Sequence, residues 1–226
     1  MLIKYITPIT VILIISTSAH ADRRFYIWSY QFSTVAPGEL ELESYSTLSF
    51  VKSDYTINSF QQQFELEYGI TRRLDVSLYQ VVSKTIASPL KLESSKLRGR
   101  LKLSEKGNLF VDPLIYLEWV RNYDFKRPNI IEAKIVLAKD VGLINFSINA
   151  SAEREITKGA ELETSVTAGI GYEISPALRL GVESVNEINK EGGGNFGVGP
   201  TISASTKVAW ITGGGLLRDN KRFTRH

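Results

Sequence analysis

From residue 38 onward the chain alternates apolar and polar side chains with a period of two, and this pattern constrains the fold more than any other feature. It is clearest in residues 60–70, where aromatic and aliphatic side chains face one way and glutamine and glutamate side chains face the other. Gln62 is the single polar residue on the apolar side of that stretch. No segment with helical periodicity interrupts these stretches, so the sequence predicts an all-β chain.

The length of the alternating segments favours a membrane barrel over a soluble sandwich. Strands in soluble proteins most often have about 5–6 residues, whereas a tilted membrane strand needs about 9–11. We therefore expect a transmembrane antiparallel up-and-down β-barrel of about 12 strands, with 10 as the alternative because the last two segments have the weakest pattern. The expected strands are 39–51, 58–70, 73–84, 91–104, 109–121, 130–140, 143–154, 161–173, 177–187, 195–204, 206–213 and 216–225.

The N-terminus has the features of an export signal. Lys4 precedes the apolar run Ile6–Ile15, and small residues stand at the positions expected for cleavage after Ala21. The sequence thus predicts a cleavable signal peptide at 1–21, an N-terminal periplasmic or plug segment at 22–37 and an outer-membrane β-barrel at 38–226. Because no later apolar run approaches the length of a spanning helix, a membrane location requires a closed barrel.

Composition excludes several classes of protein. The chain has no cysteine, which rules out a disulfide scaffold and a lipid anchor attached at a cysteine. Removal of residues 1–21 leaves 26 basic and 24 acidic residues, and these charges are mixed along the strands. A nucleic-acid partner is therefore not expected.

The connections suggest a direction for the chain. If the first strand rises from the periplasm, the connections at 52–57, 85–90, 122–129, 155–160 and 188–194 fall outside the cell, and these are the longer and more polar ones. The expected inner turns are mostly tight, as in Val141-Gly142 and Ser175-Pro176. Long outer loops and short inner turns are typical of Gram-negative outer-membrane barrels.

Turn and strand motifs carry a resemblance to one family. The hairpins Tyr68–Val76 and Gly171–Glu183, the stretch Gly197–Thr201 and the opening Pro37–Glu41 are similar to outer-membrane barrels of the largely uncharacterised group that includes the "MetA-pathway of phenol degradation" proteins. The resemblance implies a porin-like barrel for uptake of a small hydrophobic or ionic solute. It also implies outer-membrane lipid, lipopolysaccharide and the barrel-assembly machinery as partners. The chain departs from such barrels at its end, which is Phe223-Thr224-Arg225-His226 and not a terminal aromatic residue.

The distribution of histidine argues against an enzyme. His20 lies in the expected signal peptide and His226 is the last residue, so the barrel itself has no histidine to act as a general base or to bind zinc. Alternating glutamates remain, and a hydrated interior explains them better than a pair of catalytic carboxylates does. We expect no catalytic residues, no cofactor and no metal.

Charged side chains are expected to line the interior. They form an acidic set on the first two strands and a basic set on the fourth, which we expect to face each other: Glu39, Glu41, Glu43, Glu65 and Glu67 against Arg98, Arg100 and Lys102. Such charges could either brace the barrel or select solutes.

Two main functions follow from these features. The first is a narrow channel or transporter for small solutes or ions; the second is a non-conducting structural or adhesion barrel with a plugged interior and partner-binding outer loops. A barrel enzyme is the third and weakest alternative. The aromatic residues of 22–37 alternate as in a strand, but an even strand number favours a plug, and Pro37-Gly38 favours a break in the chain.

Overall fold

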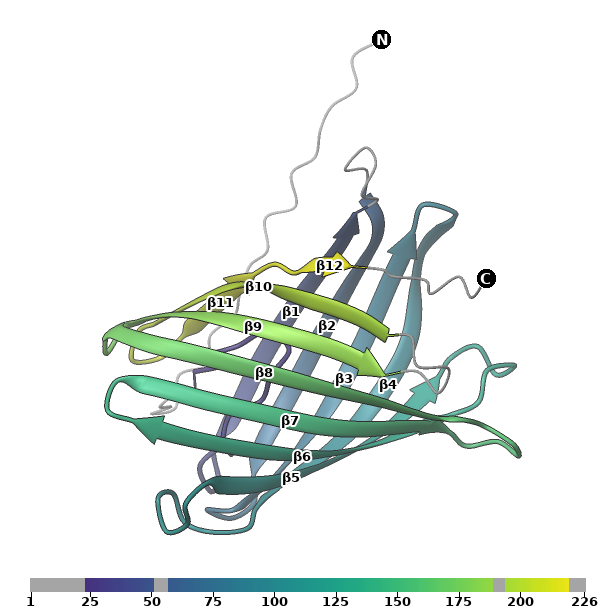
Figure 1. Ribbon diagram of the computed structural model, residues 1–226. Coiled ribbons are helices and arrows are strands. Elements are labelled where there is room, and N and C mark those ends of the chain that lie inside the picture. The colour runs from purple at the N-terminus through teal and green to yellow at the C-terminus, as the bar shows by residue number, and fades with distance from the viewer. Residues whose placement is uncertain (1–22, 51–56, 189–193, 220–226) are drawn as a thin grey trace, which may run out of the picture.

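The computed structural model describes residues 23–50, 57–188 and 194–219, and within them the chain is all-β, as predicted (Figure 1). The predicted signal peptide lies outside these residues. The strands are β1 (Leu40–Phe50), β2 (Ile57–Gly69), β3 (Leu74–Thr85), β4 (Ser88–Lys102), β5 (Asp112–Asn122), β6 (Ile130–Val141), β7 (Ile144–Glu155), β8 (Leu162–Ser175), β9 (Leu178–Ile188), β10 (Gly194–Ser205), β11 (Trp210–Gly214) and β12 (Leu217–Asp219).

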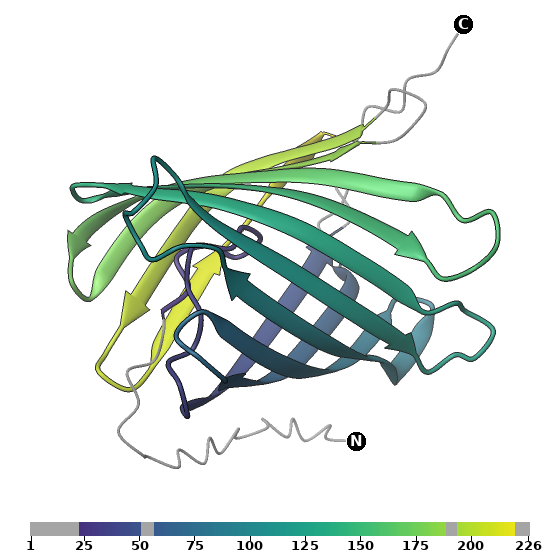
Figure 2. The same cartoon turned by 90° about the horizontal axis from the view of Figure 1, so that it is seen from below.

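These strands form one antiparallel up-and-down sheet. Each strand from β1 to β10 pairs with the next one in the chain, and the sheet curls into a half-barrel (Figures 1 and 2). Among the described residues, no backbone pairing joins β1 to β11 or β12. The expected fold class is confirmed, and the first ten strands begin and end within three residues of their predicted bounds. Across the described residues no helix is long and apolar enough to cross a membrane.

The C-terminal strands differ from the prediction of two further wall strands at 206–213 and 216–225. The chain turns at Thr206–Ala209, where the Thr206 N–H donates to the Ala209 carbonyl at 2.7 Å. β11 then pairs with one half of β10, from Thr201 to Ser205, and β12 pairs with the other half. The two strands thus share one edge, because the glycines at 213–215 interrupt the strand without reversing it. The sheet has eleven strand positions, and the predicted strand at 216–225 lies only partly within the described residues.

The alternation of the sequence separates two faces of the sheet. On the exterior face, the convex one, every strand from β1 to β10 presents exposed large apolar side chains, such as Leu78, Ile135 and Ile170. The interior face, the concave one, carries buried polar side chains, including Glu65, Asn149 and Glu183. Sheet pairing aligns side chains of one type across neighbouring strands, as where Leu66 pairs with Leu42 on one side and Leu78 on the other.

Residues 23–37, which we call the N-terminal segment, form no strand and run along the interior face (Figure 2). The segment ends at Pro37, which makes an isolated parallel bridge with Gly69. Gly38 follows with a φ of 79°, a left-handed conformation that suits glycine, and the chain then enters β1. The interior of the half-barrel is therefore occupied by the chain's own N-terminal residues.

Candidate functional site

One buried carboxylate holds the middle of the N-terminal segment. Glu183 on β9 accepts three consecutive backbone N–H groups, from Ile27 at 2.7 Å, Trp28 at 3.0 Å and Ser29 at 2.7 Å. The Glu183 side chain is fully buried, so these three donors replace its hydration. Hydrogen bonds to a charged acceptor are about twice as strong as neutral ones, which makes Glu183 the principal anchor of the segment.

The next residue of the segment is held by β7. The Tyr30 N–H donates to the Asn149 side-chain oxygen at 2.5 Å, and the Asn149 amide nitrogen donates to the Tyr30 carbonyl at 3.0 Å. Ser147, two residues away on the same face, also donates its hydroxyl to the Tyr30 carbonyl. The side chains of β7 thus pair with this backbone as a neighbouring strand would.

Tyr26 occupies a recess in β8. Its hydroxyl donates to Asn145 and lies 2.8 Å from the side-chain oxygen of that residue. The ring packs over Gly169, where a Cβ atom would lie 2.7 Å from ring carbon Cε1, and Gly171 faces the same space. Burial raises the pKa of the Tyr26 hydroxyl above its usual value. Two inward-facing glycines in β8 therefore leave room for one aromatic ring.

The segment also contributes to an apolar cluster. Phe32 packs with buried side chains of β5 and β6, and Tyr30 packs against this group. The other members are Leu114, Tyr116, Val136 and Ala138. β5 and β6 are thus apolar on both faces at this level, because the N-terminal segment covers the inner one.

Arg24 contacts both edges of the half-barrel. Its carbonyl accepts hydrogen bonds of 2.6 Å from Ser203 on β10 and from Thr212 on β11. Its guanidinium donates to the Tyr45 hydroxyl on β1 at 2.9 Å and lies over the Tyr30 ring. Since no backbone pairing joins these edges in the described residues, Arg24 links them through its carbonyl on one side and its guanidinium on the other.

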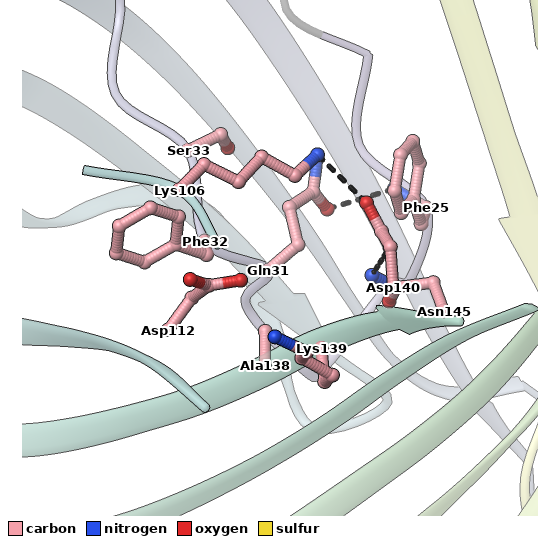
Figure 3. A pocket seen from close by; sticks show the side chains of 10 residues that line it. All are labelled: Phe25, Gln31, Phe32, Ser33, Lys106, Asp112, Ala138, Lys139, Asp140 and Asn145. Atoms are coloured by element: carbon pink, nitrogen blue, oxygen red, sulfur yellow. Dashed lines mark hydrogen bonds and ion pairs between the residues drawn. The ribbon is translucent and has the colours of Figure 1, made fainter. Parts of the chain in front are cut away.

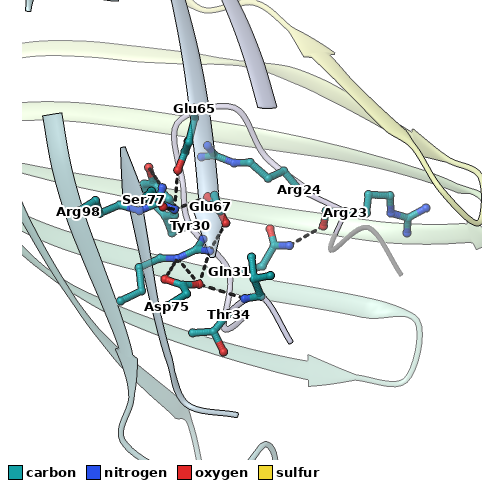
Figure 4. A network of polar contacts seen from close by, with 12 residues as sticks. Arg23, Arg24, Tyr30, Gln31, Thr34, Glu65, Glu67, Asp75, Ser77 and Arg98 are labelled. Carbon is teal, nitrogen blue, oxygen red and sulfur yellow. Dashed lines mark hydrogen bonds and ion pairs between the residues drawn. The ribbon is translucent and has the colours of Figure 1, made fainter. Parts of the chain in front are cut away.

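The predicted interior charges lie side by side, because β1 to β4 are neighbours in the sheet. Arg98 pairs with Glu65 at 2.6 Å and with Glu67, and Arg100 pairs with Glu67 and with Asp75, each at 2.6 Å (Figure 4). All five side chains are buried. Asp75 also accepts the Val35 N–H at 3.0 Å, so the network joins the N-terminal segment.

The remaining predicted charges have different surroundings. Glu41 and Glu43 are buried on β1, and their carboxylates lie within 4.8 Å of one another and of Glu67. Carboxylate oxygens are ligands for hard cations, but two arginines already bind Glu67, and we assign this group to the ion-pair network. Glu39 is half-buried at the start of the barrel wall, and Lys102 is half-buried with its ammonium 5.6 Å from the Phe32 ring centroid.

The interior cavity beside the segment is small. It has a volume of about 90 Å³, and Phe25, Gln31 and Phe32 of the N-terminal segment are among its lining residues (Figure 3). Lys106 and Asp140 form an ion pair of 2.7 Å in its wall. Pockets for drug-sized ligands have about 300–1,000 Å³, so this space suits a few water molecules or one small ion.

Sequence reasoning missed the anchors of the segment. Glu183, Asn145 and Asn149 follow the same alternation as every other interior polar residue, and nothing in the pattern marks them as binding the backbone. Two signals were present: the inward glycines of β8, and the apolar character of β5 on both faces. Each indicates that something covers the interior face at that point.

The sequence matches no protein-family model, and no curated protein matches it.

Proposed function

We propose that the protein is an outer-membrane β-barrel that forms a narrow channel for small solutes or ions, and that its N-terminal segment closes the channel. The observation that carries the membrane assignment is the distribution of polarity. Large apolar side chains are exposed on the exterior face of all ten long strands, whereas charged groups are buried inside. A soluble monomer rarely exposes so large an apolar surface, and a lipid-facing barrel requires it.

The contacts of the N-terminal segment support a removable plug. Its backbone is held mainly by polar side chains of the interior face, with Glu183, Asn149 and Asp75 as acceptors. Such groups would be hydrated in an open channel, so release of the segment exchanges these hydrogen bonds for hydrogen bonds to water.

A non-conducting barrel is the second candidate. The observation in its favour is the buried network of Arg98, Arg100, Glu65, Glu67 and Asp75, which braces one side of the interior. Removing one partner from such a network is strongly destabilising, which suits a structural role. In that case the outer connections would carry the function, by binding a partner.

Two measurements test the proposal. The mature protein should fractionate with the outer membrane and migrate on gels in a heat-modifiable way, and recovery as a soluble periplasmic protein would contradict the membrane assignment. In planar bilayers it should show rare openings of low conductance, which weakening of the segment's anchors makes frequent. A folded barrel that stays closed after those anchors are removed would favour the structural alternative.

A further inference from the structure

Exposed cations gather at one end of the sheet, at the connection 123–129 between β5 and β6 and the connection 156–161 between β7 and β8. Five basic side chains are exposed there: Arg121, Lys126, Arg127, Arg154 and Lys158. Two of them are already held, since Arg121 lies over the Phe125 ring and Arg127 lies 3.8 Å from Glu93. Within the described part of the chain, Arg154 and Lys158 make no ion pair.

Both of these cations line a groove of about 480 Å³ on the exterior side of the sheet. Its lining also includes Ile131, Ile156 and Thr157. Arg154 pairs in register with Ile131 on β6 and with Leu162 on β8, so it projects from the exterior face between two exposed apolar side chains. Glu155 also lines the groove, but alternation along β7 directs it toward the interior side.

This arrangement matches the chemistry of an anionic amphiphile. A phosphate could bind the guanidinium of Arg154 and the ammonium of Lys158, both of which suit phosphate oxygens. Hydrocarbon chains from the same molecule would continue along Ile131, Leu162 and Trp119, which pairs with Ile131 on the exterior face. The boundary between a charged rim and an apolar belt is where a lipid headgroup meets its acyl chains.

We propose that Arg154 and Lys158 form a binding site for the phosphate groups of a phosphorylated glycolipid of the lipopolysaccharide type. The inference rests on the proposed function together with the predicted direction of the chain, which places the connections 122–129 and 155–160 outside the cell and this end of the barrel in the outer leaflet. In that leaflet the anionic amphiphile is lipopolysaccharide. The site lies on the exterior face, so it acts independently of the interior and of the N-terminal segment.

The test uses the full mature chain refolded in detergent, with lipid A as the probe and native mass spectrometry as the readout. We expect Arg154→Gln/Lys158→Gln to lower lipid A affinity by about ten- to thirtyfold, since each basic residue near an anionic lipid surface contributes about 1 kcal/mol. Lys84→Gln/Lys91→Gln is the matched control, because both lysines are exposed at the same end on β3 and β4. The control should bind within about twofold of the unmodified chain.

Binding to other lipids distinguishes a phosphate site from nonspecific charge attraction. The unmodified chain should bind dephosphorylated lipid A more weakly than lipid A, by a factor similar to the loss in the double variant. This result does not depend on how the variants fold. Two results would contradict a specific site and indicate nonspecific charge attraction. One is an equal loss of lipid A affinity in both double variants, and the other is binding of phosphatidylglycerol as tightly as lipid A. If no heat-modifiable barrel forms at all, the proposed function fails; if the barrel forms and the double variant binds normally, only the lipid site fails.

Discussion

Tyr26 and Gly169 fit together as ring and recess: a Cβ atom at residue 169 would lie 2.7 Å from the tyrosine ring. This contact couples the N-terminal segment to β8 by shape, in addition to the hydrogen bonds nearby. It also offers a way to displace the segment without changing any charge.

We expect Gly169→Val to push Tyr26 out of its recess and to increase the open probability in planar bilayers. Inserting methyl groups into a packed site costs about 1–3 kcal/mol, which is enough to shift an equilibrium between a docked and a released segment. Gly99→Val is the control, because Gly99 is on β4 and a Cβ there meets nothing closer than 3.9 Å. Identical conductance of the two variants would argue against a plug that docks through Tyr26.

A second prediction concerns the carboxylate that binds three backbone donors. Glu183→Gln removes the charge and leaves an amide that can accept fewer of these hydrogen bonds, so the segment should dock more weakly. Trypsin cleavage after Arg23 or Arg24 in the folded barrel should accelerate, as followed by mass spectrometry. Glu163→Gln changes a solvent-exposed glutamate on the same interior face of the sheet, and it should leave the cleavage rate unchanged. Equal rates of trypsin cleavage in the two variants would show that Glu183 does not anchor the segment.

Docking of the segment should depend on pH through Tyr26. Burial raises the pKa of its hydroxyl, so the docked form keeps the proton while a released tyrosine ionises near pH 10. The stabilising effect is complete below that pH and is lost as pH rises above it. Conductance should therefore increase above about pH 10 in the unmodified protein, and this step should be absent in Tyr26→Phe. If conductance increases in the same way in both proteins, a group other than Tyr26 is responsible for the pH dependence.

The buried ion-pair network should dominate the stability of the β1–β4 side. Arg98→Met leaves Glu65 and Glu67 without their shared partner and should reduce the free energy of unfolding by about 3–5 kcal/mol in urea titrations. Arg73→Met is the comparison, since Arg73 and Glu105 form an exposed pair of 2.8 Å and should contribute less than about 1 kcal/mol. Similar losses for the two variants would show that the network is not buried as described.

The two faces of the sheet can be tested with one substitution type. Ile148→Arg, on the exterior face of β7, should cost about 2–4 kcal/mol near the bilayer midplane, and Glu163→Arg, on the interior face, much less. Ser147 is unsuitable as the interior position because its hydroxyl holds the Tyr30 carbonyl. Refolding into lipid vesicles measures both values, and equal costs would contradict the assigned faces.

Much of the fold follows from local pattern. In strands such as β2 and β7, alternation fixes which residues share a face, and short turns fix which strands pair. The pattern fails at residues 206–219, because β11 and β12 are short and the glycines at 213–215 allow a strand to be interrupted as well as reversed. The sequence also predicts which charged side chains face the interior. It does not predict their ion-pair partners, because these depend on which strands are neighbours in the sheet.

The position of the N-terminal segment could not be derived from its own sequence. Tyr26, Trp28, Tyr30 and Phe32 alternate as they would in a wall strand, and only the interior side chains that bind the segment distinguish the two positions. The position of the segment matters because the sheet has eleven strand positions within the described residues, whereas bacterial single-chain barrels have an even number of strands. A segment that moved into the wall beside β1 would make twelve.

Deletion of residues 22–36 would show whether the N-terminal segment closes the barrel. The truncated protein and the mature chain would be refolded side by side, checked for heat-modifiable migration and compared for conductance in planar bilayers. We expect that the truncated barrel still folds and conducts at a level clearly above that of the mature chain. A folded barrel with unchanged conductance would contradict the plug, and failure to assemble would show that the segment is part of the wall.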